Sequence, residues 1–214
     1  MKNYLLIAVL FFSQLVFSQS ADKGRLNIYM GGGAEFMNRE GNGNINIQKK
    51  YISSKAFLGF DYHIKEQISL GLESISQNYI MDDTTKVKNV SAGCIGVNLK
   101  FHFLNREKSS AYFGTSIGGF SFEYQVKDSI LNEGRLIGNG FYNTFFLGYN
   151  KYFGKVFGLF IQTGFINQPM QMNSLTFNGT AYDTWNRLRI ANWNILMRGL
   201  FINAGLNFKF RNKE

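Results

Sequence analysis

A strict alternation of side-chain types near the carboxyl end is the feature that most constrains this 214-residue chain. Between residues 200 and 210 every second position is apolar, and most of the intervening positions are polar or glycine. The apolar set is Leu200, Ile202, Ala204, Leu206, Phe208 and Phe210. Successive side chains of a β-strand point to opposite faces of its sheet. The segment is therefore predicted to be a strand with one apolar face.

The same alternation recurs in seven earlier segments, which predicts about eight strands, with ten as the alternative count. These segments are residues 26–36, 56–62, 68–72, 95–103, 111–126, 141–149 and 157–165. The segment 111–126 is irregular, because its apolar parity changes between Ile117 and Phe120. The intervening pair Gly118 and Gly119 predicts a β-bulge at this point.

Composition fits a sheet with two unlike faces. The chain is 16% aromatic and only 17% charged, yet its mean hydropathy is −0.14. Such a balance arises when apolar and polar residues alternate instead of forming separate runs. A single cysteine, Cys94, excludes a disulfide framework and any cysteine-rich metal site.

Residues 1–20 are predicted to be a cleaved signal peptide. Lys2 precedes an apolar stretch over residues 5–17, and Ser18 and Ser20 supply the small residues of a cleavage site. An uncleaved membrane anchor is the alternative. The mature domain would then be residues 21–214. Because the chain is exported, we expect no nucleic-acid partner despite its net charge of +9.

The connections between the alternating segments are short and long in turn. Short connections are predicted at residues 64–67, 105–110 and 154–155, and long ones at 38–50, 80–89, 127–139 and 167–192. With an even number of strands, both chain ends lie on the short-turn side of a barrel. No later window has 18 consecutive apolar residues, so a membrane could be crossed only by strands closed into a barrel.

A soluble lipocalin-like or sandwich domain is the alternative, since its strands also alternate but turn their apolar residues inward. Two features favour lipid-facing residues. The apolar face is continuous, and aromatic rings gather at strand ends as they do at membrane interfaces. These rings are Tyr62, Phe101, Phe103, Tyr149, Phe208 and Phe210.

The last strand carries a family resemblance. Residues 203–210 read Asn-Ala-Gly-Leu-Asn-Phe-Lys-Phe, which resembles the carboxy-terminal assembly signal of outer-membrane barrels. Together with the signal peptide and the eight segments, the chain resembles the small eight-stranded outer-membrane β-barrel proteins. It departs from their commonest form by adding residues 211–214 after the final phenylalanine.

The resemblance implies an all-β fold, an up-and-down antiparallel transmembrane barrel in the outer membrane of a Gram-negative bacterium. It also implies outer-membrane lipids as surroundings and the barrel-insertion machinery as a partner during assembly. The residues that this machinery would recognise are Asn203, Gly205, Phe208 and Phe210.

The predicted lumen is too narrow for a porin channel, because eight strands enclose only enough space for side chains. Glycines on the inward parity leave room for Tyr29, Tyr142 and Phe160. Buried charges must be paired. Both signs are available on the inward parity, from Glu35, Asp61, Glu73, Lys100 and Lys209.

No enzyme, cofactor or metal site is expected. The two histidines, His63 and His102, fall at the turn side of their strands, where hydrogen bonds to neighbours are more probable than catalysis or metal binding. Basic residues outnumber acidic ones on the short-turn side, among them Arg25 and Lys65. We expect that side to meet the anionic inner leaflet.

Two functions lead the interpretation. The first is a structural or accessory barrel that docks with a larger outer-membrane complex. The second is a ligand-binding or adhesion barrel that acts through its long loops; a lipid-modifying enzyme is a distant third. The longest loop is predicted to form a docking surface, because tryptophan and arginine dominate interface hot spots. Its candidates are Trp185, Arg187, Arg189 and Trp193.

Overall fold

The computed structural model describes residues 24–41, 50–80, 87–126, 134–177, 180–182 and 194–210. The strands are β1 (Leu26–Gly41), β2 (Lys50–Lys65), β3 (Ile68–Ile80), β4 (Val87–Arg106), β5 (Ser109–Val126), β6 (Gly134–Tyr152), β7 (Phe157–Phe177), β8 (Thr180–Tyr182) and β9 (Asn194–Phe210). The predicted signal peptide, residues 1–20, lies outside this part of the chain. No helix within the described ranges is long and apolar enough to cross a membrane.

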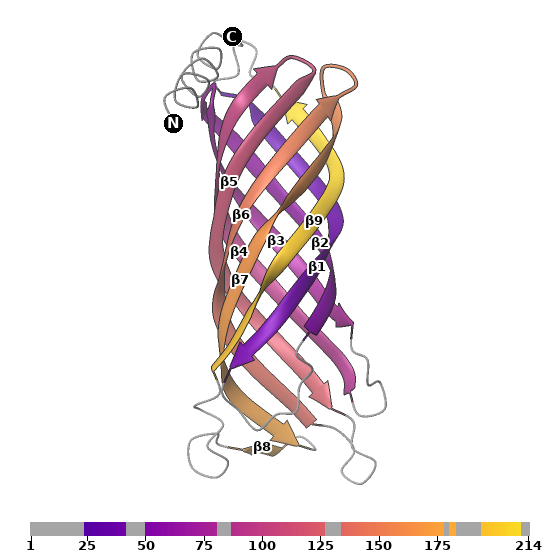
Figure 1. Ribbon diagram of the computed structural model, residues 1–214, viewed down its shortest axis with the longest axis vertical. Helices are drawn as coiled ribbons and strands as arrows, with labels where there is room; N and C mark the ends of the chain where they lie inside the picture. Colours follow the sequence, from indigo (N-terminus) through magenta and orange to yellow (C-terminus); the bar gives the residue numbers. More distant parts are fainter. Residues whose placement is uncertain are drawn as a thin grey trace, which may run out of the picture.

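Eight strands form a closed antiparallel ring (Figure 1). Each of β1 to β7 pairs with the next strand, and β9 joins β7 to β1. The remaining strand, β8, is not part of the ring. It has three residues and extends the sheet beside the last part of β7. The predicted count of eight spanning strands is confirmed.

The register of the ring fixes the tilt of its strands. Stepping from each residue to its partner on the next strand, a circuit that starts at Leu26 returns to β1 at Phe36, ten residues further along. The partners on this path are Leu26, Tyr62, Leu70, Leu99, Thr115, Phe145, Phe165, Leu200 and Phe36. With usual strand spacings, this stagger tilts the strands by about 40° from the barrel axis.

The two ends of the barrel differ. At the turn end, drawn at the top of Figure 1, two-residue turns at 66–67 and 107–108 and a four-residue turn at 153–156 join the strands, as the sequence predicted. The opposite, loop end carries β8. There the strands are longer than predicted, because β6 already begins at Gly134 and β7 continues to Phe177. Much of two predicted long loops is therefore strand.

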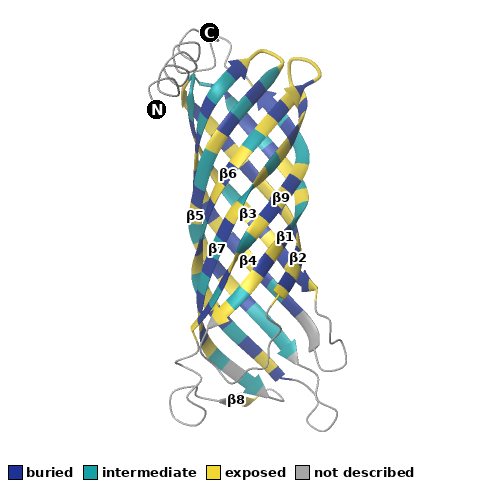
Figure 2. Cartoon of the chain, in the orientation of Figure 1, coloured by how far each residue is buried: buried dark blue, intermediate teal, exposed yellow. Residues whose placement is uncertain are grey.

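Exposed apolar side chains form a belt around the turn-end section, and Figure 2 shows the alternation of buried and exposed positions. The belt residues include Met30, Leu58, Phe60, Tyr62, Leu70, Leu72, Ile95, Val97, Leu99, Phe113, Ile117, Phe145, Leu147, Tyr149, Leu159, Ile161, Phe165, Leu200, Ile202 and Phe210. Rings pack together at the turn-end rim of the belt, where the centroids of Phe157 and Phe208 are 5.8 Å apart. The outward direction of the apolar parity is thus confirmed.

Beyond the belt, toward the loop end, the two faces exchange character. The wall becomes mainly polar on the outside, with exposed residues such as Asn38, Lys50, Ser76, Asn78, Ser121, Asn139 and Gln171. The interior becomes apolar and rich in methionine. Its buried residues include Met37, Val90, Ala92, Phe120, Phe122, Leu136, Met170, Met172, Ile195 and Met197. A strand therefore keeps its geometry while its apolar parity moves from the outside to the inside.

This exchange corrects the predicted bulge at Gly118 and Gly119. The register of β5 runs through both glycines without a shift, against β4 on one side and β6 on the other. Ile117 is exposed in the belt, whereas Phe120 is buried in the loop-end core. The change of apolar parity marks the end of the belt, and no extra residue is inserted.

Candidate functional site

The lumen at the turn end is filled by a polar cluster around the two histidines. The rings of His63 and His102 lie 4.6 Å apart between centroids. Nη2 of Arg25 donates to Nε2 of His63 at 2.8 Å, and Ser110 Oγ lies 2.7 Å from Nδ1 of His102. Both histidines are buried and bonded to neighbours, as predicted. Arg25 is 1% exposed, so its expected place on the basic surface was wrong.

Next to this cluster, on the side toward the loop end, lies a buried ion pair beside two tyrosines, Tyr29 and Tyr112. Lys100 Nζ is 2.6 Å from Asp61 Oδ2 and 4.1 Å from the ring centroid of Tyr29. The two charges are taken out of water, and the ring face adds a favourable contact for the cation. The structure thus pairs two of the inward-facing charged residues that the sequence singled out, Asp61 and Lys100.

Glu73 has tyrosine partners in place of a lysine. The hydroxyl of Tyr142 donates to Glu73 Oε1 at 2.9 Å, and that of Tyr29 lies 3.4 Å from Oε2. A Cβ at Gly59 would overlap the ring of Tyr29, and one at Gly96 would overlap Tyr142. These glycines make room for the tyrosines, as the sequence predicted.

A second ion pair closes the polar part of the lumen and was missed by the sequence. Lys55 Nζ donates to Glu35 Oε1 at 2.9 Å, and both side chains are buried. Ser53 and Gln77 also donate to the Glu35 carboxylate, at distances between 2.8 and 3.0 Å. The alternation could have predicted that Lys55 faces the lumen, because Lys55 shares its parity with Asp61. It was missed because the predicted strand began at residue 56.

The other predicted residues are placed as follows. Lys209 donates to the carbonyl of Glu107 at 2.8 Å. Asn203 and Gly205 of the predicted assembly signal face the lumen, whereas Phe208 and Phe210 face outward on β9. The predicted docking surface of Trp185, Arg187, Arg189 and Trp193 lies outside the described residues. Within the described ranges, no group of three or more histidine, cysteine or acidic residues could hold a metal ion.

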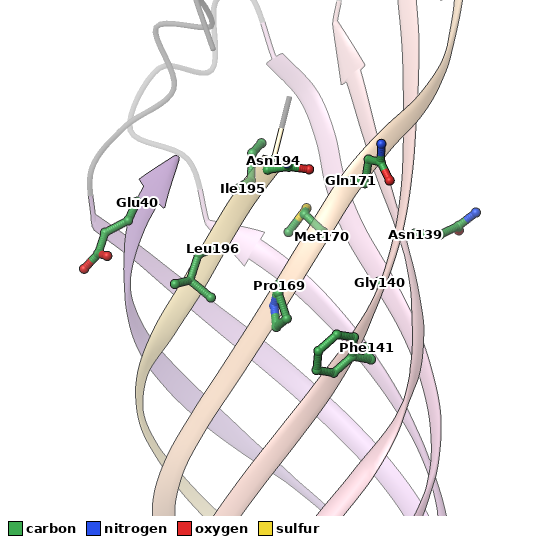
Figure 3. Close-up of a pocket in the computed structure, with 10 residues that line it drawn as sticks. All are labelled: Glu40, Asn139, Gly140, Phe141, Pro169, Met170, Gln171, Asn194, Ile195 and Leu196. Atoms are coloured by element: carbon green, nitrogen blue, oxygen red, sulfur yellow. The ribbon is translucent and has the colours of Figure 1, made fainter. Parts of the chain in front are cut away.

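A groove of about 560 Å³ crosses the outer wall above the belt (Figure 3). It lies over β6, β7, β9 and the last part of β1. The ladder between β6 and β7 is interrupted there, between Gly140–Met170 and Asn143–Asn167. Pro169 faces the interruption and has no N–H to donate. The lining residues are Glu40, Asn139, Gly140, Phe141, Pro169, Met170, Gln171, Asn194, Ile195 and Leu196.

Solved structures with this architecture are outer-membrane barrels. AlkL, solved in lipid bilayers, matches with a TM-score of 0.58 and 13% identity over 92% of this chain and 95% of its own. OprG of Pseudomonas aeruginosa matches with a TM-score of 0.55 and 11% sequence identity. The match covers 89% of this chain and 98% of OprG. Ail of Yersinia pestis matches with a TM-score of 0.50 and 8% sequence identity. The match covers 88% of this chain and 99% of Ail.

The chain has the fold of the small outer-membrane β-barrels. The predicted architecture, with transmembrane strands, is thereby confirmed at the level of the fold, and the proteins matched are those of Gram-negative outer membranes. No protein-family model matches the sequence. No curated protein is similar to it in sequence.

Proposed function

We propose that the protein is a non-conducting outer-membrane barrel with a structural or accessory role, which docks with other outer-membrane components through its loop end. The filled lumen is the observation that carries this proposal. Two buried ion pairs, Lys100–Asp61 and Lys55–Glu35, occupy successive levels of the interior. Tyr142 is fully buried beside them. We expect these side chains to block the passage of hydrated ions, because eight strands enclose only enough space for side chains.

Planar-bilayer recording tests the filled lumen. The reconstituted wild-type protein should show no large, steady single-channel conductance. A conducting porin reconstituted in the same bilayer serves as the positive control. Heat-dependent gel mobility establishes that both proteins are folded. Steady conductance from the wild-type protein would overturn the proposal.

The docking role has a separate test. After extraction in mild detergent, a larger outer-membrane protein should co-purify with the barrel in a fixed ratio. A lone barrel that adheres to cells or to surface sugars would instead support the second candidate, ligand binding or adhesion through the long loops. The buried apolar core of the loop-end section is compatible with either of these two roles.

A further inference from the structure

The outward residues above the belt follow a repeated pattern on three neighbouring strands. On β6 the outward order toward the loop end is Phe145, Asn143, Phe141, Asn139. On β7 it is Phe165, Asn167, Pro169, Gln171, and on β9 it is Leu200, Arg198, Leu196, Asn194. On each strand, the outward positions beyond the belt are thus a polar residue, an apolar residue and then a carboxamide.

The register aligns these residues into rows across the strands. Asn139 pairs with Gln171, and Gln171 pairs with Asn194. A second row, nearer the belt, joins Asn143, Asn167 and Arg198 through the same ladders. Between the rows, Pro169 is paired with Leu196. On this wall an apolar strip therefore lies between two polar rows. The groove includes the strip and the row of Asn139, Gln171 and Asn194.

We propose that this groove binds the sugar headgroup of a glycolipid in the outer leaflet. A carboxamide both donates and accepts hydrogen bonds, and a sugar hydroxyl needs both. The apolar strip of Phe141, Pro169 and Leu196 matches the C–H face of a sugar ring. The acyl chains of the same lipid would lie against the belt residues just below, such as Phe145 and Phe165.

The charges beside the groove favour a neutral sugar over a phosphate as the occupant. Glu40 lines the groove, and its carboxylate forms an ion pair with the guanidinium of Arg198. The carboxylate disfavours a phosphate at this place, and the arginine already has an anionic partner. The groove volume of about 560 Å³ falls within the range of about 300–1,000 Å³ that is usual for small-ligand sites.

Native mass spectrometry of the folded, full-length barrel tests the site with two probes. One is a diacylglycerol that carries a neutral glucose headgroup, and the other has the same acyl chains and a phosphoethanolamine headgroup. The glucosyl lipid should bind more tightly. In the double variant Gln171→Leu and Asn194→Leu its affinity should fall about tenfold, the effect of losing one or two hydrogen bonds, while the affinity for the second lipid should not change.

The matched control changes exposed residues above the belt on another strand. Ser76→Leu with Asn78→Leu adds similar apolar area to β3 and should leave the affinity for the glucosyl lipid unchanged. Heat-dependent gel mobility checks that each variant folds. Equal affinity of the wild type for both lipids, a preference for the phosphate lipid, an equal loss in both variants, or occupation of the groove by a second copy of the chain would overturn the proposal. None of these results bears on the conductance test.

Discussion

The turn-end and loop-end sections of the barrel share the same strands, but their outer and inner faces have opposite polarity. In the turn-end section the belt faces outward, and charged, polar and aromatic side chains fill the lumen. In the loop-end section residues such as Asn38 and Asn78 face outward, and Met37 and Phe122 are buried inside. The outer wall is therefore built for lipid in the turn-end section and for water in the loop-end section. The strand itself continues without interruption, as β5 does through Gly118 and Gly119.

Different interactions must therefore stabilise the two sections. Within lipid, an apolar belt gains little by contact with similarly apolar chains, so the turn-end lumen depends on satisfied hydrogen bonds and ion pairs. The loop-end section has polar groups outside, and its buried methionines and phenylalanines give it the core of a water-soluble barrel. The layer of Glu35, Lys55 and Gln77 lies where one arrangement gives way to the other.

The largest predicted effect comes from breaking the ion pair in that layer. Lys55→Met leaves the Glu35 carboxylate buried without its cation. Such changes lower the free energy of unfolding by about 3–5 kcal/mol. Urea unfolding of the reconstituted barrel, followed by gel mobility, measures the loss. The double variant Lys55→Met with Glu35→Gln should recover much of it. If both variants were equally unstable, the pairing of charge would not be the cause.

Truncation in the loop-end core should cost somewhat less. Met37 is 2% exposed, and Met37→Ala should lower the free energy of unfolding by about 2–4 kcal/mol through lost burial and the cavity left behind. The neighbouring Asn38 is exposed on the opposite face and provides the control. Asn38→Ala should be nearly neutral. Equal costs at the two positions would contradict the apolar interior of this section.

A charge on the outer wall should distinguish belt from loop end. Leu147 lies within the belt on β6 and is 57% exposed. Leu147→Arg should destabilise the barrel by about 2–4 kcal/mol if that position lies near the middle of the bilayer. Ser121→Arg, on the polar outer wall of β5, should have little effect. Refolding yields in lipid vesicles and urea midpoints measure both, and a harmless arginine at Leu147 would place the belt outside lipid.

The smallest effect is expected at an exposed ion pair of the loop-end wall. Arg135 Nε lies 2.6 Å from Glu123 Oε1, and both side chains reach solvent. Exposed pairs contribute little and are screened by salt. Arg135→Ala should therefore leave the urea midpoint almost unchanged at 0.15 M salt, by the same assay. A loss as large as that from Met37→Ala would mean that this wall is not in contact with water.

Most of the fold could be predicted from period-two alternation, because the belt residues contrast strongly with their neighbours on each strand. The loop-end section could not, since its apolar parity is the opposite one and its outer wall resembles a polar loop in sequence. Residues 134–139 and 167–177 were read as loops for that reason. Lys55 was missed because the predicted segment began at residue 56, whereas β2 begins at Lys50. Asp61 and Lys100 lay inside clean strands.

The candidate groove was beyond the reach of alternation alone. Asn139, Gln171 and Asn194 are far apart in sequence, and only the register places them in one row. Arg25 was misplaced for a similar reason. It precedes β1 by one residue, and the sequence could not show that its side chain turns inward to His63.

The pairing of β1 with β9 has a consequence for the order of folding. Leu26 is paired with Phe210, so the contact that seals the ring joins the two extremes of the described chain. Such non-local contacts slow folding, because the long loop between them must be ordered first. The seam can form only when both ends of the chain have reached the membrane. Until the ring closes, β1 and β9 each have an unpaired edge, and such edges promote aggregation.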